Sequence, residues 1–261
     1  MNKTVCYSIL SLSIIGIFSC SESNEVVEQK ETGHLKIEQI QLTHELDNDS
    51  YDNSELTVQL EFPKLVRTDS NMVNTILLQE KSRRMNKSAI TDSIFEDNQR
   101  VLSQLETAYQ QFKRDFPEID TQWYLDRKLD VVAEETDYLT LRFEESSFLG
   151  GAHPTQLIFF TSYDKKTGKH LYLKDLFTSN EIDMLKTLAK KQFLNQKGLK
   201  IGDDLEANGW FFPNGAFALS SNFCKTESTL ILFYNRYDIG SYAAGATQLE
   251  IDLKNLVEHE S

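Results

Sequence analysis

The sequence has little cysteine and no surplus of positive charge. Its 261 residues include three cysteines, 27 lysines and arginines, and 40 aspartates and glutamates, so the formal net charge is −13. A surface of this sign repels nucleic acid and anionic membranes, which excludes both as favoured partners and favours a basic partner or none. Acidity can also serve only to keep an exported domain soluble, so charge alone does not establish a binding function.

The few cysteines exclude an internal disulfide framework. Cys6 and Cys20 both belong to the N-terminal segment, which leaves Cys224 alone in the rest of the chain. A lone cysteine has no intramolecular partner, so the folded part depends on its hydrophobic core. We expect Cys224 to be a small buried residue, with a reactive thiol as the alternative.

The apolar run at the N-terminus is too short for a spanning helix. Lys3 precedes an uncharged, mostly apolar run over residues 5–18, whereas crossing a bilayer takes roughly 20 residues. Such a run is typical of a secretory signal peptide. The ending Ile17-Phe18-Ser19-Cys20 resembles a bacterial lipobox, so residues 1–19 are expected to be a lipoprotein signal peptide and Cys20 to carry the lipid. A secreted protein without lipid and an uncleaved anchor are the alternatives.

The segment after the predicted cleavage point is polar, acidic and without aromatic residues. Residues 20–33 cannot bury a core with this composition, which predicts a flexible tether. Glu22 and Glu25, close behind the cysteine, resemble the surface-export signals of bacterial lipoproteins. The resemblance implies a lipid-anchored protein of the cell envelope, at the outer membrane or the cell surface. The membrane would then be contacted through the lipid on Cys20 only.

The remaining sequence predicts an α+β fold with antiparallel sheets and about three helices, because strand and helix patterns come in blocks rather than in strict alternation. Alternating apolar residues predict strands at 35–46 and 56–62, hairpins within 123–148 and 155–173, and strands at 217–219, 230–234 and 248–253. Helical spacing predicts helices from Asp69, over Asp92–Asp115, and from Thr178 to Gly198, the last with a Thr178-x-x-Glu181 capping box.

Motifs of catalysis, metal binding and nucleotide binding are missing from the sequence. It has no Gly-x-Ser-x-Gly elbow, no glycine loop for phosphate and no dinucleotide fingerprint. A calcium loop counted from Asp47 fails, because Asp52 and Val58 replace the required glycine and glutamate. The histidines that lack zinc-ligand spacing are His34, His44, His170 and His259. We therefore expect no cofactor, no metal site and no catalytic residue.

The most unusual stretch is Gly150-Gly151-Ala152-His153-Pro154, between two strand patterns. The two glycines allow positive φ, and the proline fixes the next φ and removes a donor. A histidine in such a turn can lock two strands together through a carbonyl or a tyrosine hydroxyl; the alternatives are a ligand contact and a catalytic or metal role. The candidate ligand-binding residues are His153, Tyr237, Asp238 and Tyr242, and the candidate turn residues are Gly150, Gly151, Pro154 and Gly245.

This stretch belongs to a series of motifs that resembles a known family. "FLGGAHP", "YDKKTGKHLYLKDLF", a helix and "FYNRYDIGSYAAG" follow one another as in DUF3298 domains. The upstream half, with "WYLDRKLDVVAEETDYLTLRFEE", resembles the DUF4163 domain that often precedes it. We therefore expect two half-domains packed together, a DUF4163-like half at 34–145 and a DUF3298-like half at 146–261. The chain departs from the family at Gly240-Ser241, where Ala-Pro is usual.

The tandem is similar to the extracellular part of a lysozyme-sensing anti-sigma factor and to the non-catalytic N-terminal region of a peptidoglycan deacetylase. The resemblance implies a cell-envelope recognition module. Its partner would be a cell-wall component such as a peptidoglycan fragment, or a basic envelope-targeting protein such as a lysozyme. The alternatives are an envelope glycan hydrolase that uses His153 and Asp238, and a passive structural lipoprotein.

Overall fold

The computed structural model describes residues 19–32, 35–47, 56–66, 71–91, 93 and 97–257. The predicted signal peptide lies outside these residues except for Ser19, and so do His34, His259 and most of the rejected calcium loop. The side chain of Cys20 also lies outside the described part, so its lipidation stays a prediction.

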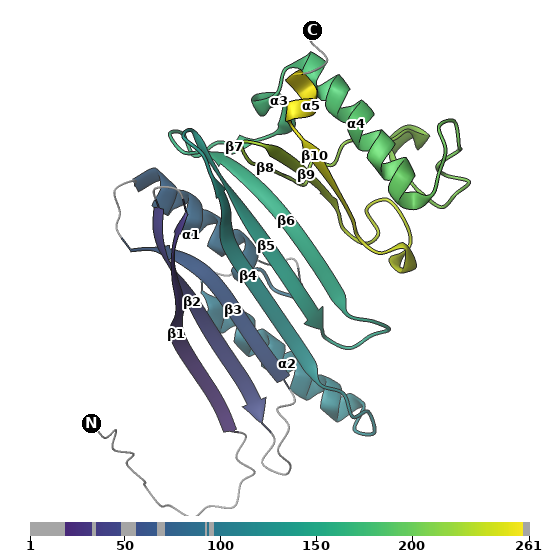
Figure 1. Ribbon diagram of the computed structural model, residues 1–261. Coiled ribbons are helices and arrows are strands. Elements are labelled where there is room, and N and C mark those ends of the chain that lie inside the picture. Colours follow the sequence, from purple (N-terminus) through teal and green to yellow (C-terminus); the bar gives the residue numbers. More distant parts are fainter. Residues whose placement is uncertain are drawn as a thin grey trace, which may run out of the picture.

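The described chain contains ten strands, five α-helices and two short 3-10 helices (Figure 1). The strands are β1 (Ser19–Thr32), β2 (Leu35–Asp47), β3 (Leu56–Leu65), β4 (Trp123–Glu134), β5 (Tyr138–Phe148), β6 (Thr155–Asp164), β7 (His170–Leu171), β8 (Phe223–Lys225), β9 (Thr229–Tyr234) and β10 (Thr247–Asp252). The helices are α1 (Asn71–Met85), α2 (Asn98–Asp115), α3 (Leu173–Leu176), α4 (Ser179–Lys197), α5 (Lys254–Val257), η1 (Pro213–Gly215) and η2 (Tyr242–Ala244).

The first seven strands form one large sheet in chain order, and every neighbouring pair is antiparallel except β3 and β4. Parallel neighbours need a long crossover, which α1 and α2 supply (Figure 1). The predicted α+β class is confirmed, with α1, α2 and α4 as its three long helices. The sheets are antiparallel as predicted except between β3 and β4, which pair in parallel. Alternating burial looks the same in either kind of pairing, so the sequence pattern did not distinguish this pair.

The first hydrophobic core lies between the large sheet and these two helices. Burial alternates along β4, and the inward residues Leu125 and Leu129 are fully buried. Leu105 of α2 belongs to the same core. This helix begins at Asn98, later than predicted, because the Asp97 carboxylate accepts the Arg100 N–H at 3.1 Å and so caps it.

The second core lies in the C-terminal unit, which we define as residues 173–257. Its sheet has the order β10-β9-β8, and α4 packs against it. The capping box predicted for α4 is present, since Thr178 and Glu181 each accept the other's backbone N–H through a side-chain oxygen. Gly198 ends the helix in the left-handed conformation. Cys224 is buried in this unit, as expected, and burial raises the pKa of its thiol to about 11.

The boundary expected between residues 145 and 146 does not separate two units. β5 and β6 pair from Tyr138↔Asp164 to Ser147↔Thr155, across that boundary and inside the large sheet. The chain changes sheets only after β7. The boundary is expected from the resemblance to two known domains, and a family resemblance does not show which strands pair across it.

Residues 20–33, expected to be a flexible tether, lie mostly in β1. This strand pairs with β2 from Ser19↔Asp47 to Thr32↔Leu35. Strand pairing uses backbone groups, so a polar segment can occupy a sheet edge without an apolar face to bury.

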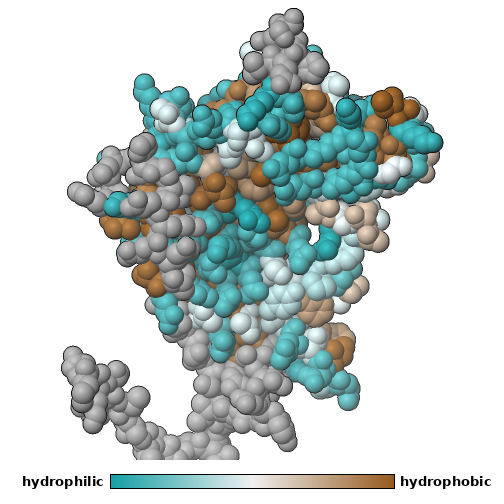
Figure 2. Space-filling model, in the orientation of Figure 1, coloured by the Kyte–Doolittle hydropathy of each residue, from teal (hydrophilic) through white to brown (hydrophobic). Residues whose placement is uncertain are grey.

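On the face shown in Figure 2, hydrophilic residues predominate, and hydrophobic residues show between them, several of them over the C-terminal unit. Ile201 and Phe211 are two large apolar side chains of this unit that are exposed. None of the described helices is long and apolar enough to cross a membrane.

Candidate functional site

The Gly-Gly-Ala-His-Pro turn joins β5 to β6. Gly150 and Gly151 have φ angles of 81° and 116°, the positive range that the sequence predicts for them. A Cβ at Gly150 would lie 3.5 Å from Cζ2 of Trp123, so the turn also packs against the start of β4. The turn leaves His153 exposed at the end of the hairpin.

His153 lies beside two of the three residues predicted to accompany it. Its ring stacks on that of Tyr242, with centroids 3.8 Å apart and planes 19° from parallel. The Tyr237 hydroxyl oxygen lies 3.2 Å from Nε2 of His153, and the Tyr242 hydroxyl donates to the Pro154 carbonyl at 3.2 Å. These contacts hold the hairpin turn against a loop of the C-terminal unit. They support the structural role of His153, in which its ring connects two segments of the chain.

Asp238, the third predicted companion, has a different role. Its carboxylate accepts the Asn235 N–H at 2.7 Å, a turn contact within its own loop. Among the contacts of the described residues, none joins Asp238 to His153. The pair that the hydrolase alternative requires is therefore not assembled. Gly245 ends η2 with a φ of 72°, as its predicted turn role requires.

Two asparagines that sequence reasoning missed complete the joint between the large sheet and the C-terminal unit. Asn235 pairs with Ile158 as a strand would: its Oδ1 accepts the Ile158 N–H at 2.8 Å, and its Nδ2 donates to the Ile158 carbonyl at 2.9 Å. Asn222 accepts the Phe160 N–H and donates to the same Ile158 carbonyl, both at 2.7 Å. Side-chain amides therefore satisfy this stretch of the outer edge of β6.

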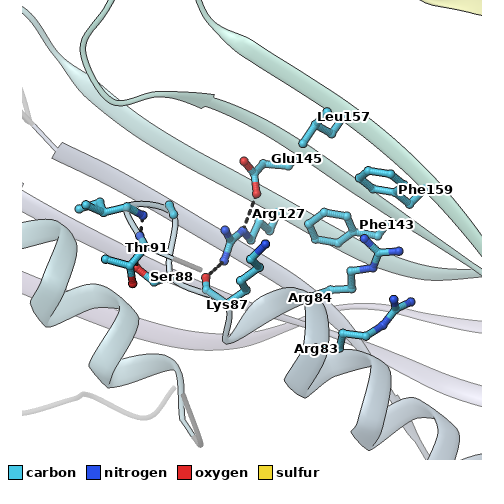
Figure 3. Close-up of a pocket in the computed structure, with 12 residues that line it drawn as sticks. Arg83, Arg84, Lys87, Ser88, Thr91, Arg127, Phe143, Glu145, Leu157 and Phe159 are labelled. Carbon is cyan, nitrogen blue, oxygen red and sulfur yellow. Dashed lines mark hydrogen bonds and ion pairs between the residues drawn. The ribbon is translucent and has the colours of Figure 1, made fainter. Parts of the chain in front are cut away.

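A pocket with a strongly cationic lining opens on the helix-covered face of the large sheet (Figure 3). Its volume is about 500 Å³, and it lies between the end of α1, the loop that follows, and strands β4, β5 and β6. We call it the arginine pocket. Its lining residues are Arg83, Arg84, Lys87, Ser88, Ala89, Ile90, Thr91, Arg127, Phe143, Glu145, Leu157 and Phe159.

The local structure around α1 explains the position of the cations. Arg83 and Arg84 lie in the last turn of the helix, where positive charge interacts favourably with the helix dipole. The loop that follows is held by Ser88, whose hydroxyl accepts the N–H groups of Ile90 and Thr91. The same hydroxyl donates to the side chain of Gln104 on α2 at 2.7 Å, so the loop is fixed to the neighbouring helix.

Arg127 is a buried structural cation of the pocket, with 3% of its side chain exposed. Its Nε donates to Glu145 at 2.9 Å, and its Nη1 donates to the carbonyl of Lys87 at 2.6 Å (Figure 3). The same Nη1 also donates to the carbonyl of Met85 at 3.0 Å. A guanidinium this deeply buried is stable only when it is paired. These bonds tie β4 to β5 and to the loop after α1.

The two helix arginines share the buried carboxylate of Glu80, whose side chain is 1% exposed. It accepts two hydrogen bonds from Arg83, at 2.6 and 2.8 Å, one from Arg84 at 3.1 Å, and one from the Tyr163 hydroxyl at 2.7 Å. Burial alone would raise the pKa of Glu80, but the hydrogen bonds from Arg83 and Tyr163 outweigh burial and hold this pKa below its usual value. One carboxylate thus serves two guanidinium groups.

Arg84 is less completely paired than its neighbours. Only its Nε donates a hydrogen bond within the described part of the chain, and its side chain is 17% exposed. Its guanidinium carbon lies 4.4 Å from the ring centroid of Phe159 and 5.3 Å from that of Phe143. Burial, together with the neighbouring charge of Arg83, lowers the pKa of Arg84. A cation in this state would be stabilised by an anion.

The lining of the arginine pocket combines four cationic side chains with one carboxylate, that of Glu145, and several apolar groups. Such a lining suits an anion that carries an apolar part. Among the described residues, no group of three or more His, Cys, Asp or Glu side chains could hold a metal ion. A run visible in the sequence, "KSRRMNK" at 81–87, marks one wall of the pocket. The register of the sheet determines which residues of β4, β5 and β6 face this run.

The fold defines the class of protein: a large, mostly antiparallel sheet that carries a smaller α+β unit along one edge. Residues 174–254 match the model of the family described as "Protein of unknown function (DUF3298)". The chain carries a DUF3298 domain, as its C-terminal motifs predict, and this domain coincides with the C-terminal unit.

Two solved structures resemble the chain over most of its length. A DUF3298 family member from Bacteroides fragilis has a TM-score of 0.67 and 21% identity, covering 87% of this chain and 94% of its own. A DUF3298 family protein from Pseudomonas aeruginosa has a TM-score of 0.57 and 18% identity, covering 85% and 93%. At these identities the likenesses show the fold alone. No curated protein matches the chain, and the DUF4163 resemblance of the upstream half stays a prediction.

Proposed function

We propose that this protein is a lipid-anchored, non-catalytic binding module of the bacterial cell envelope, and that it takes a cell-wall component into the arginine pocket. The observation that carries the proposal is the pocket, a cationic and partly apolar hollow on a chain of net charge −13. A sizeable pocket with a few convergent polar groups is the default place for a ligand. The peptide stems of bacterial walls carry free carboxylates, which fit this charge.

The carboxylates at the pocket are already engaged, which favours binding over hydrolysis. Glu145 accepts a hydrogen bond from Arg127, and Glu80 accepts hydrogen bonds from Arg83 and Arg84. The lowered pKa of Glu80 also makes it a weak base, poorly suited to take a proton at neutral pH. Hydrogen bonds hold the charged side chains of the pocket in place before a ligand arrives, and this arrangement suits binding.

The lipid on Cys20 would attach the molecule at one end of the large sheet. Cys20 lies opposite Leu46 of β2, near the start of β1. In Figure 1 this end of β1 and the C-terminal unit lie at opposite ends of the molecule, so the unit would point away from the membrane. Metabolic labelling with palmitate tests the anchor: Cys20→Ala should lose both label and membrane association. A variant that is still labelled would refute it.

Sedimentation with purified peptidoglycan sacculi tests the binding function. The wild-type protein should co-sediment, and Arg84→Gln should lose most of this binding because it removes the arginine of the pocket with the fewest hydrogen bonds. Arg114→Gln, the same change at an exposed position on α2, is the matched control and should bind like the wild type. His153→Ala should also bind the sacculi, since His153 does not line the pocket. Sacculi that leave the wild type in the supernatant would overturn the proposal.

A basic protein such as a lysozyme is a second candidate ligand, favoured by the net charge of −13. The surface that would take it is the acidic exterior rather than the arginine pocket. Because any acidic protein attracts basic ones at low salt, binding should be measured near 0.15 M salt, where the Debye length is roughly 8 Å. Binding of lysozyme but not of cytochrome c, unchanged in Arg84→Gln, would support this candidate.

A further inference from the structure

We infer that the arginine pocket recognises the terminal carboxylate of a short peptide with small apolar side chains, and that Arg84 takes this carboxylate in a bidentate pair. The inference rests on the proposed function, because it names the part of the wall that the pocket would hold, namely the free end of a peptide stem. The chemistry of Arg84 and its immediate neighbours carries it.

Arg84 is the arginine of the pocket with the most unused donors. Arg83 uses Nε and Nη2 on Glu80, and Arg127 uses Nε on Glu145 and Nη1 on two carbonyls. Arg84 uses Nε alone, so its two terminal nitrogens have no protein acceptor among the described residues. Lys87 is exposed, and its positive charge adds to that of the arginines at the pocket.

The energetics of Arg84 favour a bound anion. A guanidinium that is largely desolvated normally finds a full set of acceptors, because leaving its donors unpaired is costly. Here two guanidinium groups share the carboxylate of Glu80, and burial and the charge of Arg83 lower the pKa of Arg84. An anion that accepts from both terminal nitrogens of Arg84 would supply the missing partner in a fork geometry that matches a carboxylate.

The surroundings of Arg84 favour a carboxylate with an apolar neighbour over a phosphate. Its guanidinium carbon lies over the ring of Phe159, 4.4 Å from the centroid, and Leu157 and Ile90 line the same pocket. Ile90 is 47% exposed, so its side chain still has apolar surface to bury. A doubly charged phosphate loses more hydration on entering such a site than a singly charged carboxylate does. A methyl group next to the carboxylate, as in a terminal alanine, would contact these apolar side chains.

A matched pair of peptides tests the inference directly. N-acetyl-D-alanyl-D-alanine and its C-terminal amide differ in the one charge that Arg84 would bind. In NMR titrations of the full protein, followed at the Arg84 Nε–H and the Ile90 and Thr91 amides, the acid should bind at least about 10-fold more tightly than the amide, as expected for a charge-assisted pair.

Variants of the pocket test the role of Arg84. Arg84→Gln should weaken binding of the acid about 10- to 100-fold and leave the weak binding of the amide unchanged. Arg84→Lys keeps the charge but loses the planar fork, so its affinity should fall between wild type and Arg84→Gln. Arg114→Gln should bind like the wild type. If Arg84→Gln fails to fold, the acid and amide compared on the wild type still decide the question.

The outcomes separate this inference from the proposed function. Equal binding of acid and amide would overturn the carboxylate inference, even if sacculi bind. Binding of glycerol phosphate in place of the acid would overturn it as well and would assign a phosphate ligand. A wild type that binds neither sacculi nor peptide would end both the inference and the proposed function.

Discussion

Replacing Glu80 with glutamine removes the negative charge that Arg83 and Arg84 share. Removal of one partner from a buried ion pair costs about 3–5 kcal/mol, because the other charge stays buried and unpaired. Arg83 has 47% of its side chain exposed and keeps contact with water, and a glutamine oxygen can still accept part of the hydrogen bonds. We therefore expect the free energy of unfolding to fall by about 2–3 kcal/mol, less than a fully buried pair would lose.

Urea denaturation followed by circular dichroism measures this loss at pH 7. The matched control is Glu118→Gln, which neutralises an exposed glutamate and should change stability by less than about 0.5 kcal/mol. A Glu80→Gln protein as stable as this control would refute the reasoning, because the carboxylate would then not be what stabilises the two arginines.

The pH dependence gives an independent check. The pKa of Glu80 is lower in the folded protein than in the unfolded chain, so its stabilising contribution is fully present at any pH above the unfolded pKa. The contribution is lost as pH falls through the folded value, where the carboxylate becomes protonated. The gap between wild type and Glu80→Gln should therefore narrow from pH 7 toward pH 3. A gap that widens toward acid would contradict the lowered pKa.

Three further predictions concern the joint and the C-terminal core. Asn235→Ala should cost about 1–3 kcal/mol, because it leaves the Ile158 N–H without its acceptor, and hydrogen exchange of that amide should accelerate; unchanged exchange would rule out the amide pairing. His153→Ala should speed hydrogen exchange in the hairpin turn and around Tyr237. It should change the free energy of unfolding by less than about 1 kcal/mol, since the ring is exposed. A much larger loss of stability would contradict this local role of His153. Cys224, whose burial raises its pKa to about 11, should resist thiol reagents at pH 8 in the native protein and react after denaturation.

Local features of the fold could be predicted because neighbouring residues determine them. The capping box at Thr178 and the left-handed glycine at 198 depend on hydrogen bonds within one helical turn. The positive φ of Gly150 follows in the same way from its own lack of a Cβ. The closeness of His153 to Tyr237 and Tyr242 had a different basis, the resemblance to a known family, and the structure brings these three residues together.

Tertiary structure decided the division into units and the arginine pocket. Backbone pairing placed β1 and β6 in the large sheet, although composition suggested a tether for the first and the family resemblance a separate half-domain for the second. The pocket joins residues 83–91 to strands that begin more than thirty residues later, so its charge balance depends on sheet register. The sequence by itself determined the local turns, caps and helices, because these involve adjacent residues. Only the folded chain determined which charges share a desolvated space, because that depends on contacts between distant segments.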